Sequence, residues 1–407
     1  MQLPPLDAIR VIDLTQFLSG PHCTQILADL GAEVIKIESP EGDLSRHIPP
    51  HFIGADSLYY MSVNRGKQSV CINLKSDEGR RIARDLISTA DVVVDNFRPG
   101  VLTRLGLDHV ELRAENPRLV WCSISGFGQD GPYRDKPAYD MIVQALSGGM
   151  SMTGEPGRAS VRAGIPIGDL SAGMYAAIAI SSALYRRGES GRGDYIDVSM
   201  LDCQVAMLSY QAAYYLFSGK VPGHQGSAHD SIPTYRGFRA AGGGELVVTA
   251  NTDRMWQGLC RVLGREDLLA DPRFATNLER FENRNVLLPE LEAAFLSRRV
   301  EEWLPLLEAE SIPTGVVNTL DQVMADPQVL HRELIVEMEG DDGASVRTIG
   351  NPLRFSDSAA PAAGYPPALG EDTRRILGGV LGLSDTDVDR LAAQGAVVAG
   401  AGGVAGR

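Results

Sequence analysis

Residues 9–38 read IRVIDLTQFLSGPHCTQILADLGAEVIKIE, and this stretch decides the predicted fold. A short apolar run at residues 9–14 is followed by helical spacing over residues 21–30, a stop at Gly31 and a second apolar run at residues 33–37. Short continuous apolar runs indicate buried strands, and hydrophobic residues at helical spacing indicate a helix. The stretch therefore predicts a strand, a helix and a second strand in a parallel sheet.

The same alternation continues through the first half of the chain. Further strands are expected at residues 69–74, 92–94, 118–125 and 195–199, and helices at residues 76–89, 169–187 and 201–217. Ser76 is the expected N-cap of the first of these helices. Because apolar runs alternate with helices, the sequence predicts an α/β fold with a Rossmann-like parallel sheet covered on both faces.

The pattern changes after a loop at residues 219–231, which is rich in Gly, His and Ser. A hairpin is expected at residues 237–250, with its turn at residues 242–244, and helices follow, which predicts a smaller α+β domain. The expected boundaries are a large domain at residues 1–200, a linking helix and loop at 201–225, a small domain at 226–325, and a return to the large domain at 326–407 with a flexible C-terminal tail from Gly395.

Length and composition limit the class of protein. With 407 residues, of which 44% are hydrophobic and 22% charged, the chain is long enough for two globular domains. A net charge of −14 disfavours a general nucleic-acid surface, because phosphate binding needs a basic face. The first ten residues lack a cationic segment followed by an apolar run, and no run of about 18 apolar residues occurs, so we expect no signal peptide, no membrane span and a cytoplasmic location.

The five cysteines are odd in number and scattered, and they form no C-x-x-C pair. This pattern is typical of buried thiols and disfavours both a disulfide framework and a zinc site, so no metal is expected. The adjacent pair His22 and Cys23 is a poor catalytic dyad, because neighbouring residues on a helix point to different sides.

Residues 126–131 fit the G-x-G-x-x-G pattern of dinucleotide-binding loops and follow an expected strand. The pattern binds a pyrophosphate only where a helix opens directly after it. Here Pro132 and Pro137 bracket a short polar stretch instead. We therefore expect a tight loop beside a ligand cleft and no NAD site.

Asp169 begins a long expected helix, directly after residues 164–168. One interpretation is an N-cap, in which the side chain accepts hydrogen bonds from the first free N–H groups. The other is a nucleophile, because a carboxylate at a helix N-terminus stays ionised and an ionised carboxylate attacks an activated acyl group. Gly168 before it would let a substrate approach closely. The two interpretations are compatible.

Basic residues gather in one part of this acidic chain. They are Lys36, Arg46, Arg65, Lys67, Lys75, Arg98 and Arg104. Two interpretations are open, a local anion site and a solvated surface. Asn96, Phe97 and Arg98 follow an expected strand, where ligands bind in open α/β sheets. There Phe97 would meet an adenine ring, and the arginines would meet phosphates.

A series of segments, taken in their order and spacing, resembles the class III CoA-transferase family, also called the CaiB/BaiF family. The segments are residues 11–15 with 20–21, 27–38, 64–67, 95–100, 125–132, 168–173, 191–199 and 313–315. The resemblance covers nearly the whole chain. It implies a two-domain subunit, an interlocked homodimer, and acyl-CoA and a small carboxylic acid as partners.

The resemblance also implies roles for particular residues. Asp169 matches the family's catalytic aspartate. The residues implied to hold the CoA nucleotide are Asn96, Phe97 and Arg104, with Lys75 and Arg98 assisting. In the family's mechanism the aspartate attacks an acyl-CoA, and an aspartyl mixed anhydride and an enzyme–CoA thioester follow before a free acid takes the CoA. No cofactor is implied, since the CoA thioester is itself a substrate.

A few positions separate the branches of the family. The racemases carry a His base where this chain has Tyr139, and a tyrosine with an ordinary pKa of about 10 is a poor base near pH 7. Tyr139 looks like the tyrosine of formyl-CoA transferases, but those carry a Gln at the position of Leu18, whereas here Gln16 lies two residues earlier. The expected substrate-binding residues are Tyr139, Gln16, His229 and Asp140.

His229 lies in a short loop, residues 226–233, whose Gly-x-Ala-His-x-Ser-Ile pattern looks like that of succinyl-CoA dicarboxylate transferases. On residue type alone, a surface histidine is the alternative. The predicted reaction is CoA transfer from succinyl-CoA to a small di- or hydroxycarboxylate. Three alternatives stay open: a 2-methylacyl-CoA racemase, a formyl-CoA:oxalate CoA-transferase, and a non-catalytic acyl-CoA-binding protein.

Overall fold

The computed structural model describes residues 3–341, 343–358 and 364–399. By their internal packing these residues form two compact units. The sheet unit takes in the described residues of Met1–Gly149, Arg162–Gly219 and Leu330–Arg407, and the small unit takes in Met150–Val161 and Lys220–Val329. The small unit therefore includes residues 150–161, which the sequence pattern placed in the large domain.

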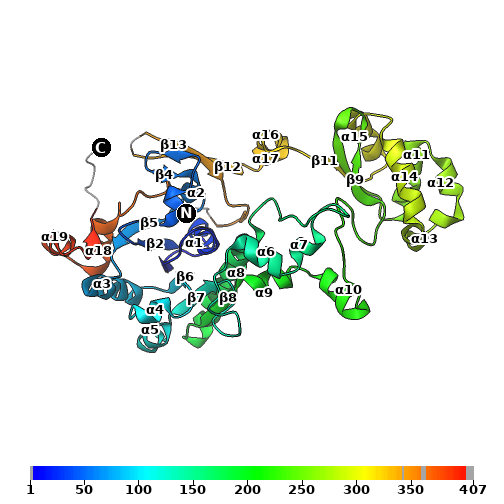
Figure 1. The fold of residues 1–407 in the computed structure, drawn as a ribbon. Coiled ribbons are helices and arrows are strands. Elements are labelled where there is room, and N and C mark those ends of the chain that lie inside the picture. Colours follow the sequence, from blue (N-terminus) through cyan, green and yellow to red (C-terminus); the bar gives the residue numbers. More distant parts are fainter. Residues whose placement is uncertain (1–2, 342, 359–363, 400–407) are drawn as a thin grey trace. The chain divides into compact units, whose positions relative to one another are not determined.

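The sheet unit is built on a seven-stranded sheet with the order β14-β5-β2-β1-β6-β7-β8 (Figure 1). The strands are β1 (Arg10–Asp13), β2 (Glu33–Glu38), β5 (Gln68–Ile72), β6 (Val92–Asp95), β7 (Val120–Ser125), β8 (Tyr195–Ser199) and β14 (Val397–Val398). All neighbouring pairs are parallel except β14 with β5. The β1–α1–β2 unit predicted from residues 9–38 is confirmed.

Both faces of this sheet are buried. The helices that cover it are α1 (Ser19–Asp29), α3 (Asp77–Ser88), α8 (Ile167–Ser190), α18 (Thr373–Leu381) and α19 (Asp385–Ala393). Val11 and Val34 pack in one core with α1 and α8, whereas the next residues, Ile12 and Ile35, pack in the other with α3, α18 and α19. Successive side chains of a strand point to opposite faces, so apolar runs without alternation are the expected pattern for such strands.

Helix α8 is the one helix in the described ranges that is long and apolar enough, by length and composition, to cross a membrane. A buried helix of a globular core passes the same test. Here Ala172, Ala176 and Ile180 are buried in the core that α8 shares with α1. A Cβ on Gly173 would lie only 2.7 Å from the backbone oxygen of Ser19, so the small residue lets the two helices approach closely.

Shorter elements complete the sheet unit, and one of them, α7, crosses the boundary along the chain into the small unit. They are β3 (Phe52–Ile53), β4 (Asp56–Ser57), α2 (Leu58–Met61), α4 (Val101–Arg104), α5 (His109–Glu115), α6 (Asp140–Leu146), α7 (Gly149–Met152), α9 (Met200–Ala206), α10 (Tyr210–Ser218), β12 (Ile335–Glu339) and β13 (Ser345–Ile349). Ser76 caps α3 as predicted, since its hydroxyl accepts a hydrogen bond from Gly79 N.

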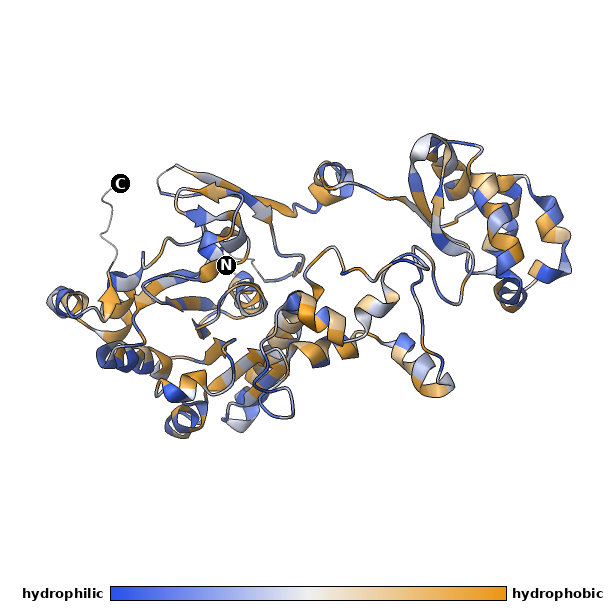
Figure 2. Ribbon diagram, viewed as in Figure 1, coloured by the Kyte–Doolittle hydropathy of each residue, from blue (hydrophilic) through white to orange (hydrophobic). Residues whose placement is uncertain are grey.

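The small unit has a three-stranded antiparallel sheet, with β9 (Tyr235–Arg239) and β10 (Glu245–Thr249) as the predicted hairpin and β11 (Thr314–Val316) as the third strand. Its helices are α11 (Asp253–Leu263), α12 (Glu266–Ala270), α13 (Asn277–Glu282), α14 (Arg284–Phe295) and α15 (Val300–Ala309), and α16 (Leu320–Met324) and α17 (Pro327–His331) follow along the chain. Trp256, Phe295 and Trp303 lie in its core. Hydrophobic and hydrophilic residues both occur along these helices, as expected where one face packs on a core (Figure 2).

Two expectations about local structure are wrong. The helix expected at residues 201–217 is broken into α9 and α10, because Ser209 adopts a left-handed backbone with φ +50° between them. The C-terminal tail was expected to be flexible from Gly395, but residues 395–399 are described, and β14 among them pairs with β5 and buries Val397. The rest of the predicted tail, residues 400–407, lies outside the described residues.

Candidate functional site

A cavity of about 530 Å³ lies where strands β1, β6 and β7 end, and we call it the main cavity. Ligands bind at the carboxyl ends of strands in open α/β sheets. Gln16, Phe17 and Ser19, which follow β1, line it together with Asn96, Phe97 and Arg98, which follow β6. The start of α6 adds Tyr139 and Asp140, and the start of α8 adds Asp169. The structure thus brings together seven of the ten predicted site residues: Asp169, Asn96, Phe97, Arg98, Tyr139, Gln16 and Asp140.

Asp169 is the third residue of α8, and the N-cap position is held by Pro166, which makes no side-chain cap. The N-cap interpretation of Asp169 is therefore wrong. The cap comes from another helix: the Asp140 carboxylate accepts hydrogen bonds from Gly168 N at 2.7 Å and from Asp169 N at 3.4 Å. A Cβ on Gly168 would lie 2.8 Å from the same carboxylate oxygen, so the glycine makes room for Asp140.

The surroundings of Asp169 favour its neutral form. The pKa of Asp169 is raised to about 7, chiefly by burial and also by the nearby charge of Asp140, while a hydrogen bond with Ser19 acts in the opposite direction. The expectation of a fully ionised carboxylate is thus incorrect, because burial and a like charge outweigh the favourable helix terminus. At neutral pH the protonated and ionised forms are both populated, which suits a group that changes its charge during a reaction.

Asn96 fixes the loop that follows β1. Its side-chain oxygen accepts a hydrogen bond from Gln16 N at 2.9 Å, and its side-chain nitrogen donates one to Gln16 O at 2.8 Å. The amide of Asn96 therefore holds the backbone of Gln16, a role that differs from the nucleotide contact implied by the family resemblance. The side chain of Gln16 remains a wall of the main cavity.

Two aromatic residues of the main cavity were missed from the sequence. Phe17 has a left-handed backbone, with φ +63°, and its ring meets the edge of the Tyr139 ring at 6.0 Å between centroids. Tyr59 lines the same cavity, and burial together with the charge of Asp169 raises its pKa to about 12, so its hydroxyl stays protonated at neutral pH. Neither residue stands in a motif, and a positive φ at a phenylalanine has no signal in the sequence.

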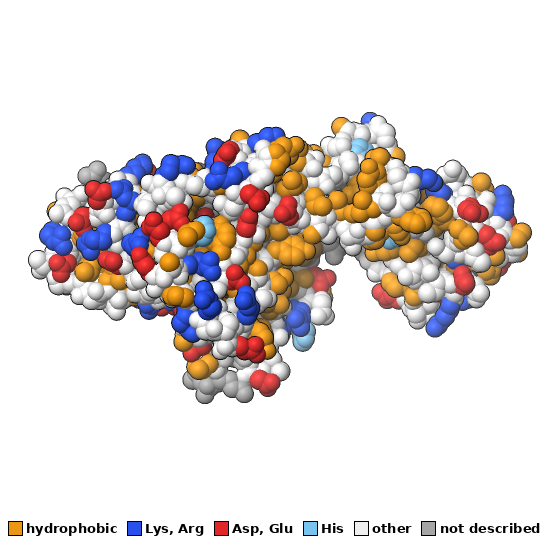
Figure 3. Space-filling view, turned by 90° about the horizontal axis from the view of Figure 1, so that it is seen from below, with side chains coloured by type: hydrophobic (Ala, Val, Ile, Leu, Met, Phe, Trp, Pro, Cys, Tyr) orange, Lys and Arg blue, Asp and Glu red, His pale blue; other side chains and the backbone are white. Residues whose placement is uncertain are grey.

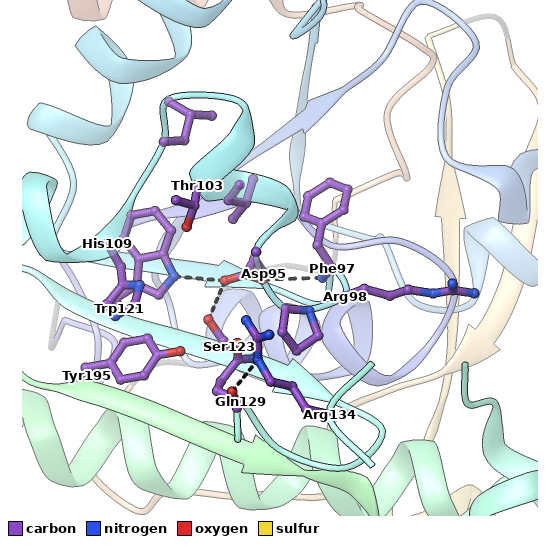
Figure 4. A pocket seen from close by; sticks show the side chains of 14 residues that line it. Asp95, Phe97, Arg98, Thr103, His109, Trp121, Ser123, Gln129, Arg134 and Tyr195 are labelled. Atoms are coloured by element: carbon purple, nitrogen blue, oxygen red, sulfur yellow. Dashed lines mark hydrogen bonds between the residues drawn. The ribbon is translucent and has the colours of Figure 1, made fainter. Parts of the chain in front are cut away.

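A smaller cavity of about 300 Å³ adjoins the first and shares Phe97, Arg98, Pro99 and Arg134 with it (Figure 4). Asp95 lies at its centre in Figure 4 and accepts hydrogen bonds from Trp121 Nε1 at 2.8 Å and Ser123 Oγ at 2.6 Å. Burial raises the pKa of Asp95 to about 6. Its carboxylate also accepts a hydrogen bond from Phe97 N at 3.3 Å, so it helps to fix the loop that both cavities share.

Three predicted site residues lie outside both cavities. Lys75 is exposed between β5 and α3, and Arg104 ends α4. His229 lies in the small unit, where its Nδ1 is 3.1 Å from Asp230 and 3.2 Å from Ser231 N, and its ring stacks on Tyr235.

The basic cluster expected from the sequence is largely not an anion site. Four of its seven members are buried in ion pairs within the sheet unit. The pairs are Lys36 with Asp43 at 2.9 Å, Arg46 with Glu38 at 2.6 Å, Arg65 with Asp29, and Lys67 with Asp13 at 3.1 Å. Both alternatives, an anion site and a solvated surface, are wrong for these four side chains, because carboxylates already compensate their charges.

The cysteines behave as the sequence predicted. All five are buried free thiols. Burial raises the pKa of Cys23 well above its ordinary value and lowers the pKa of its neighbour His22 to about 4. A thiol that resists ionisation is a poor nucleophile, so the structure gives no support to a catalytic Cys–His pair.

Comparison with known proteins places the chain in a family. Residues 6–373 match the sequence profile of CoA-transferase family III. The chain belongs to this family. Succinyl-CoA:glutarate CoA-transferase of Homo sapiens is 38% identical over 396 residues, which cover 97% of this chain and 90% of the human protein. Succinate–glutarate CoA-transferase of Agrobacterium fabrum is 39% identical over 381 residues, or 92% of this chain and 95% of that protein.

A solved structure agrees with this placement. A CaiB/BaiF family protein from Brucella suis has a TM-score of 0.83 at 38% identity and covers 93% of this chain and 100% of its own. The family resemblance and the α/β fold class predicted from the sequence are therefore confirmed. The chain is an enzyme of the class III CoA-transferase type.

The raised pKa of Asp169 predicts a stability effect. An acid with a pKa of about 7 in the folded chain and an ordinary value of 3.8 stabilises the fold below pH 3.8, and this contribution is lost as the pH rises through 7. Asp169→Asn removes the charge, so it is expected to stabilise the protein at pH 8 more than at pH 5, by about 1–2 kcal/mol. Urea unfolding at the two pH values measures this difference.

The matched control is Asp385→Asn, at a carboxylate whose side chain is 81% exposed. Its effect on the free energy of unfolding is expected to be the same at pH 8 as at pH 5. If Asp169→Asn raises the free energy of unfolding equally at both pH values, or lowers it at pH 8, the pKa of Asp169 is not raised in the folded protein.

Proposed function

We propose that this enzyme transfers CoA from succinyl-CoA to a small dicarboxylate, with Asp169 as the group that carries the acyl and CoA intermediates. The observation that carries the proposal is a half-buried carboxylate with a pKa of about 7, on the first turn of α8 and facing the main cavity. The named activities of the human and Agrobacterium fabrum relatives support succinyl-CoA as donor and a dicarboxylate as acceptor.

The proposed chemistry has four steps. A carboxylate oxygen of Asp169 attacks the thioester carbonyl of succinyl-CoA, and CoA leaves as a thiolate, which gives a mixed anhydride. The thiolate attacks the Asp169 carbonyl, which releases succinate and leaves an enzyme–CoA thioester. The acceptor carboxylate then attacks this thioester and expels the thiolate. Finally the thiolate attacks the acceptor carbonyl of the new anhydride, which releases the acceptor–CoA product and restores the Asp169 carboxylate.

Burial suits Asp169 to these steps. A carboxylate that is more basic than usual is a stronger nucleophile, and a pKa near 7 keeps a large share of it ionised at neutral pH. No proton needs to be removed from an ionised carboxylate, and the proposed route includes no step on a metal or nucleotide cofactor. Tyr59 and the backbone of Gly126 line the same cavity and offer donors for the oxyanions that form at each carbonyl.

Other residues of the main cavity, and the predicted site residues that lie outside it, also have roles in the proposal. Arg98, Arg134 and Lys136 bring positive charge to the main cavity and are proposed to meet the phosphates of CoA beside Phe97. Gln16 and Tyr139 are proposed to form the walls for the acyl group. His229, in the small unit, remains a proposed substrate contact by family resemblance alone. Arg104 and Lys75 remain proposed nucleotide contacts by family resemblance alone.

A homodimer is part of the proposal. Large apolar side chains are exposed on α8 and α10: Tyr185 is 78% exposed, Leu216 80% and Phe217 95%. Figure 3 shows hydrophobic side chains gathered on the face that it presents. Apolar surface of this kind is typical of protein interfaces, and a second copy of this chain is the proposed occupant, in line with the family resemblance. A cytoplasmic location likewise remains a proposal.

The direct test is to incubate the protein with succinyl-CoA, quench it in acid, trap activated carboxyls with hydroxylamine or borohydride, and locate the label by peptide mass spectrometry. We expect a modification on the peptide with Asp169 that is absent in Asp169→Ala. If another acyl-CoA labels Asp169 and succinyl-CoA does not, the proposal that succinyl-CoA is the donor is refuted. Absence of label with any acyl-CoA, together with exchange of the α-proton, would favour the racemase.

The charge of Asp140 is expected to set the pH dependence. The attacking form of Asp169 is ionised, so kcat/KM should rise with pH through about 7. Asp140→Asn removes a charge that raises the pKa of Asp169, so the midpoint of this rise is expected to move to lower pH. The pH profile of kcat/KM measures the shift.

Gln144→Leu is the matched control. It removes the 2.7 Å hydrogen bond from Gln144 Nε2 to Asp140 but keeps the charge of Asp140. Its midpoint is expected to stay within error of the wild type or to move upward. An Asp140→Asn midpoint that also fails to move downward would show that Asp140 does not control the ionisation of Asp169.

A further inference from the structure

The turn at residues 15–17, which leads from β1 to α1, is held by side chains from other parts of the sheet unit. Lys36 Nζ donates a hydrogen bond to Thr15 O at 2.7 Å. Asp43 Oδ1 accepts one from Phe17 N at 3.1 Å. Together with the two bonds between Asn96 and Gln16, these contacts engage backbone groups at each of the three residues.

Phe17 is the strained member of this turn. Its φ of +63° lies in the left-handed region, where a side chain with a Cβ is disfavoured and glycine is the usual residue. A non-glycine residue persists there only when its surroundings over-determine the conformation, and such residues cluster at functional sites. The hydrogen bond from Phe17 N to Asp43 holds the backbone of this residue directly.

Asp43 is itself fixed from several sides. Its Oδ1 also accepts hydrogen bonds from Ser45 N at 2.9 Å and Ser45 Oγ at 2.8 Å, and its own N–H donates to Glu38 at 3.0 Å. Its Oδ2 lies 2.9 Å from Lys36 Nζ, and both side chains are completely buried. The same ammonium group therefore links Asp43 to Thr15 O, so the pair holds both ends of the turn.

The turn determines where Phe17 and Ser19 lie relative to Asp169 in the main cavity. The Phe17 ring meets Tyr139, the residue before Asp140, and Ser19 at the start of α1 bonds with Asp169. Phe17, Tyr139, Ser19 and Asp169 all line the main cavity. A shift of about 1 Å in such a wall is enough to lower a rate by 10²-fold, because the reacting atoms lose their alignment.

We propose that Asp43, paired with Lys36, is a positioning residue for the acyl transfer: it holds the strained Phe17 turn so that Phe17 and Ser19 stand correctly beside Asp169. This inference rests on the proposed role of Asp169. It differs from a purely structural role, in which a buried ion pair stabilises the fold without any specific effect on the reaction.

The chain offers a matched control for that distinction. Asp29 and Arg65 also form an ion pair that is largely buried, and their partners are Gln25 and the backbone oxygen of Ile349 rather than the turn. Replacing a buried pair by apolar residues of similar size is often tolerated, whereas removing one partner leaves an uncompensated charge. We therefore compare Lys36→Met/Asp43→Leu with Arg65→Met/Asp29→Leu, and add Asp43→Asn, which keeps an acceptor oxygen for Phe17 N.

The measurement is the single-turnover rate at which succinyl-CoA labels Asp169, with thermal unfolding of each variant alongside. We expect Lys36→Met/Asp43→Leu to label at least about 10-fold more slowly than Arg65→Met/Asp29→Leu at equal folded fraction, with Asp43→Asn in between. The affinity for free CoA is expected to change less than the labelling rate, since Phe97, in the loop that follows β6, is held by its own hydrogen bond to Asp95.

Each outcome bears on one claim. Equal labelling rates in the two double variants would overturn the positioning role of Asp43. If the Lys36/Asp43 double variant does not fold, the Asp43→Asn protein is compared with the wild type instead. A slower labelling rate with a normal CoA affinity supports the positioning role of Asp43. An unchanged labelling rate overturns it. A wild type that is never labelled on Asp169 would instead refute the proposed function.

Discussion

The Asp140 carboxylate accepts hydrogen bonds from the first turn of α8, and the rest of the site is arranged around that contact. It caps a helix whose own N-cap residue, Pro166, has no side-chain acceptor for a hydrogen bond. It requires a residue without a Cβ at position 168. Its charge also raises the pKa of Asp169, in addition to the larger effect of burial. One carboxylate thus places the candidate nucleophile and adjusts its ionisation.

The sheet explains why these groups meet. Strands β1, β6 and β7 are parallel neighbours, so the loops that follow them emerge at one edge. Apolar side chains cover both faces of the sheet, which leaves the loops as the place where polar groups face a cavity. Behind the loops, Lys36 and Asp43 form a completely buried pair. A buried pair contributes less to stability than the attraction between its charges suggests, because removing both charges from water is costly. Here the pair fixes the position of the loop that follows β1.

Much of this could be predicted from the sequence, because the strands are continuous apolar runs and the family motifs carry their order and spacing. The position of Asp169 at the start of α8 follows from local pattern. Its cap and its pKa do not, because both depend on Asp140, on a different helix. The ion pairs were missed for the same reason: Lys67 and Asp13 are 54 residues apart, and a single sequence does not show which distant charges meet. Likewise, the residues around Phe17 and Ser209 in the sequence do not indicate that either has a left-handed backbone.

In the proposed reaction Asp169 exchanges an oxygen atom with the acceptor acid and with the released succinate, and an isotope experiment tests this exchange most directly. With glutarate labelled by ¹⁸O in both carboxylates, succinyl-CoA as donor and limited turnover, the acceptor oxygen that attacks the enzyme–CoA thioester should remain on the enzyme. Peptide mass spectrometry is then expected to find one ¹⁸O atom on Asp169, and the succinate released in later turnovers should carry ¹⁸O. If glutaryl-CoA forms while Asp169 and succinate stay free of ¹⁸O, the covalent role of Asp169 is contradicted.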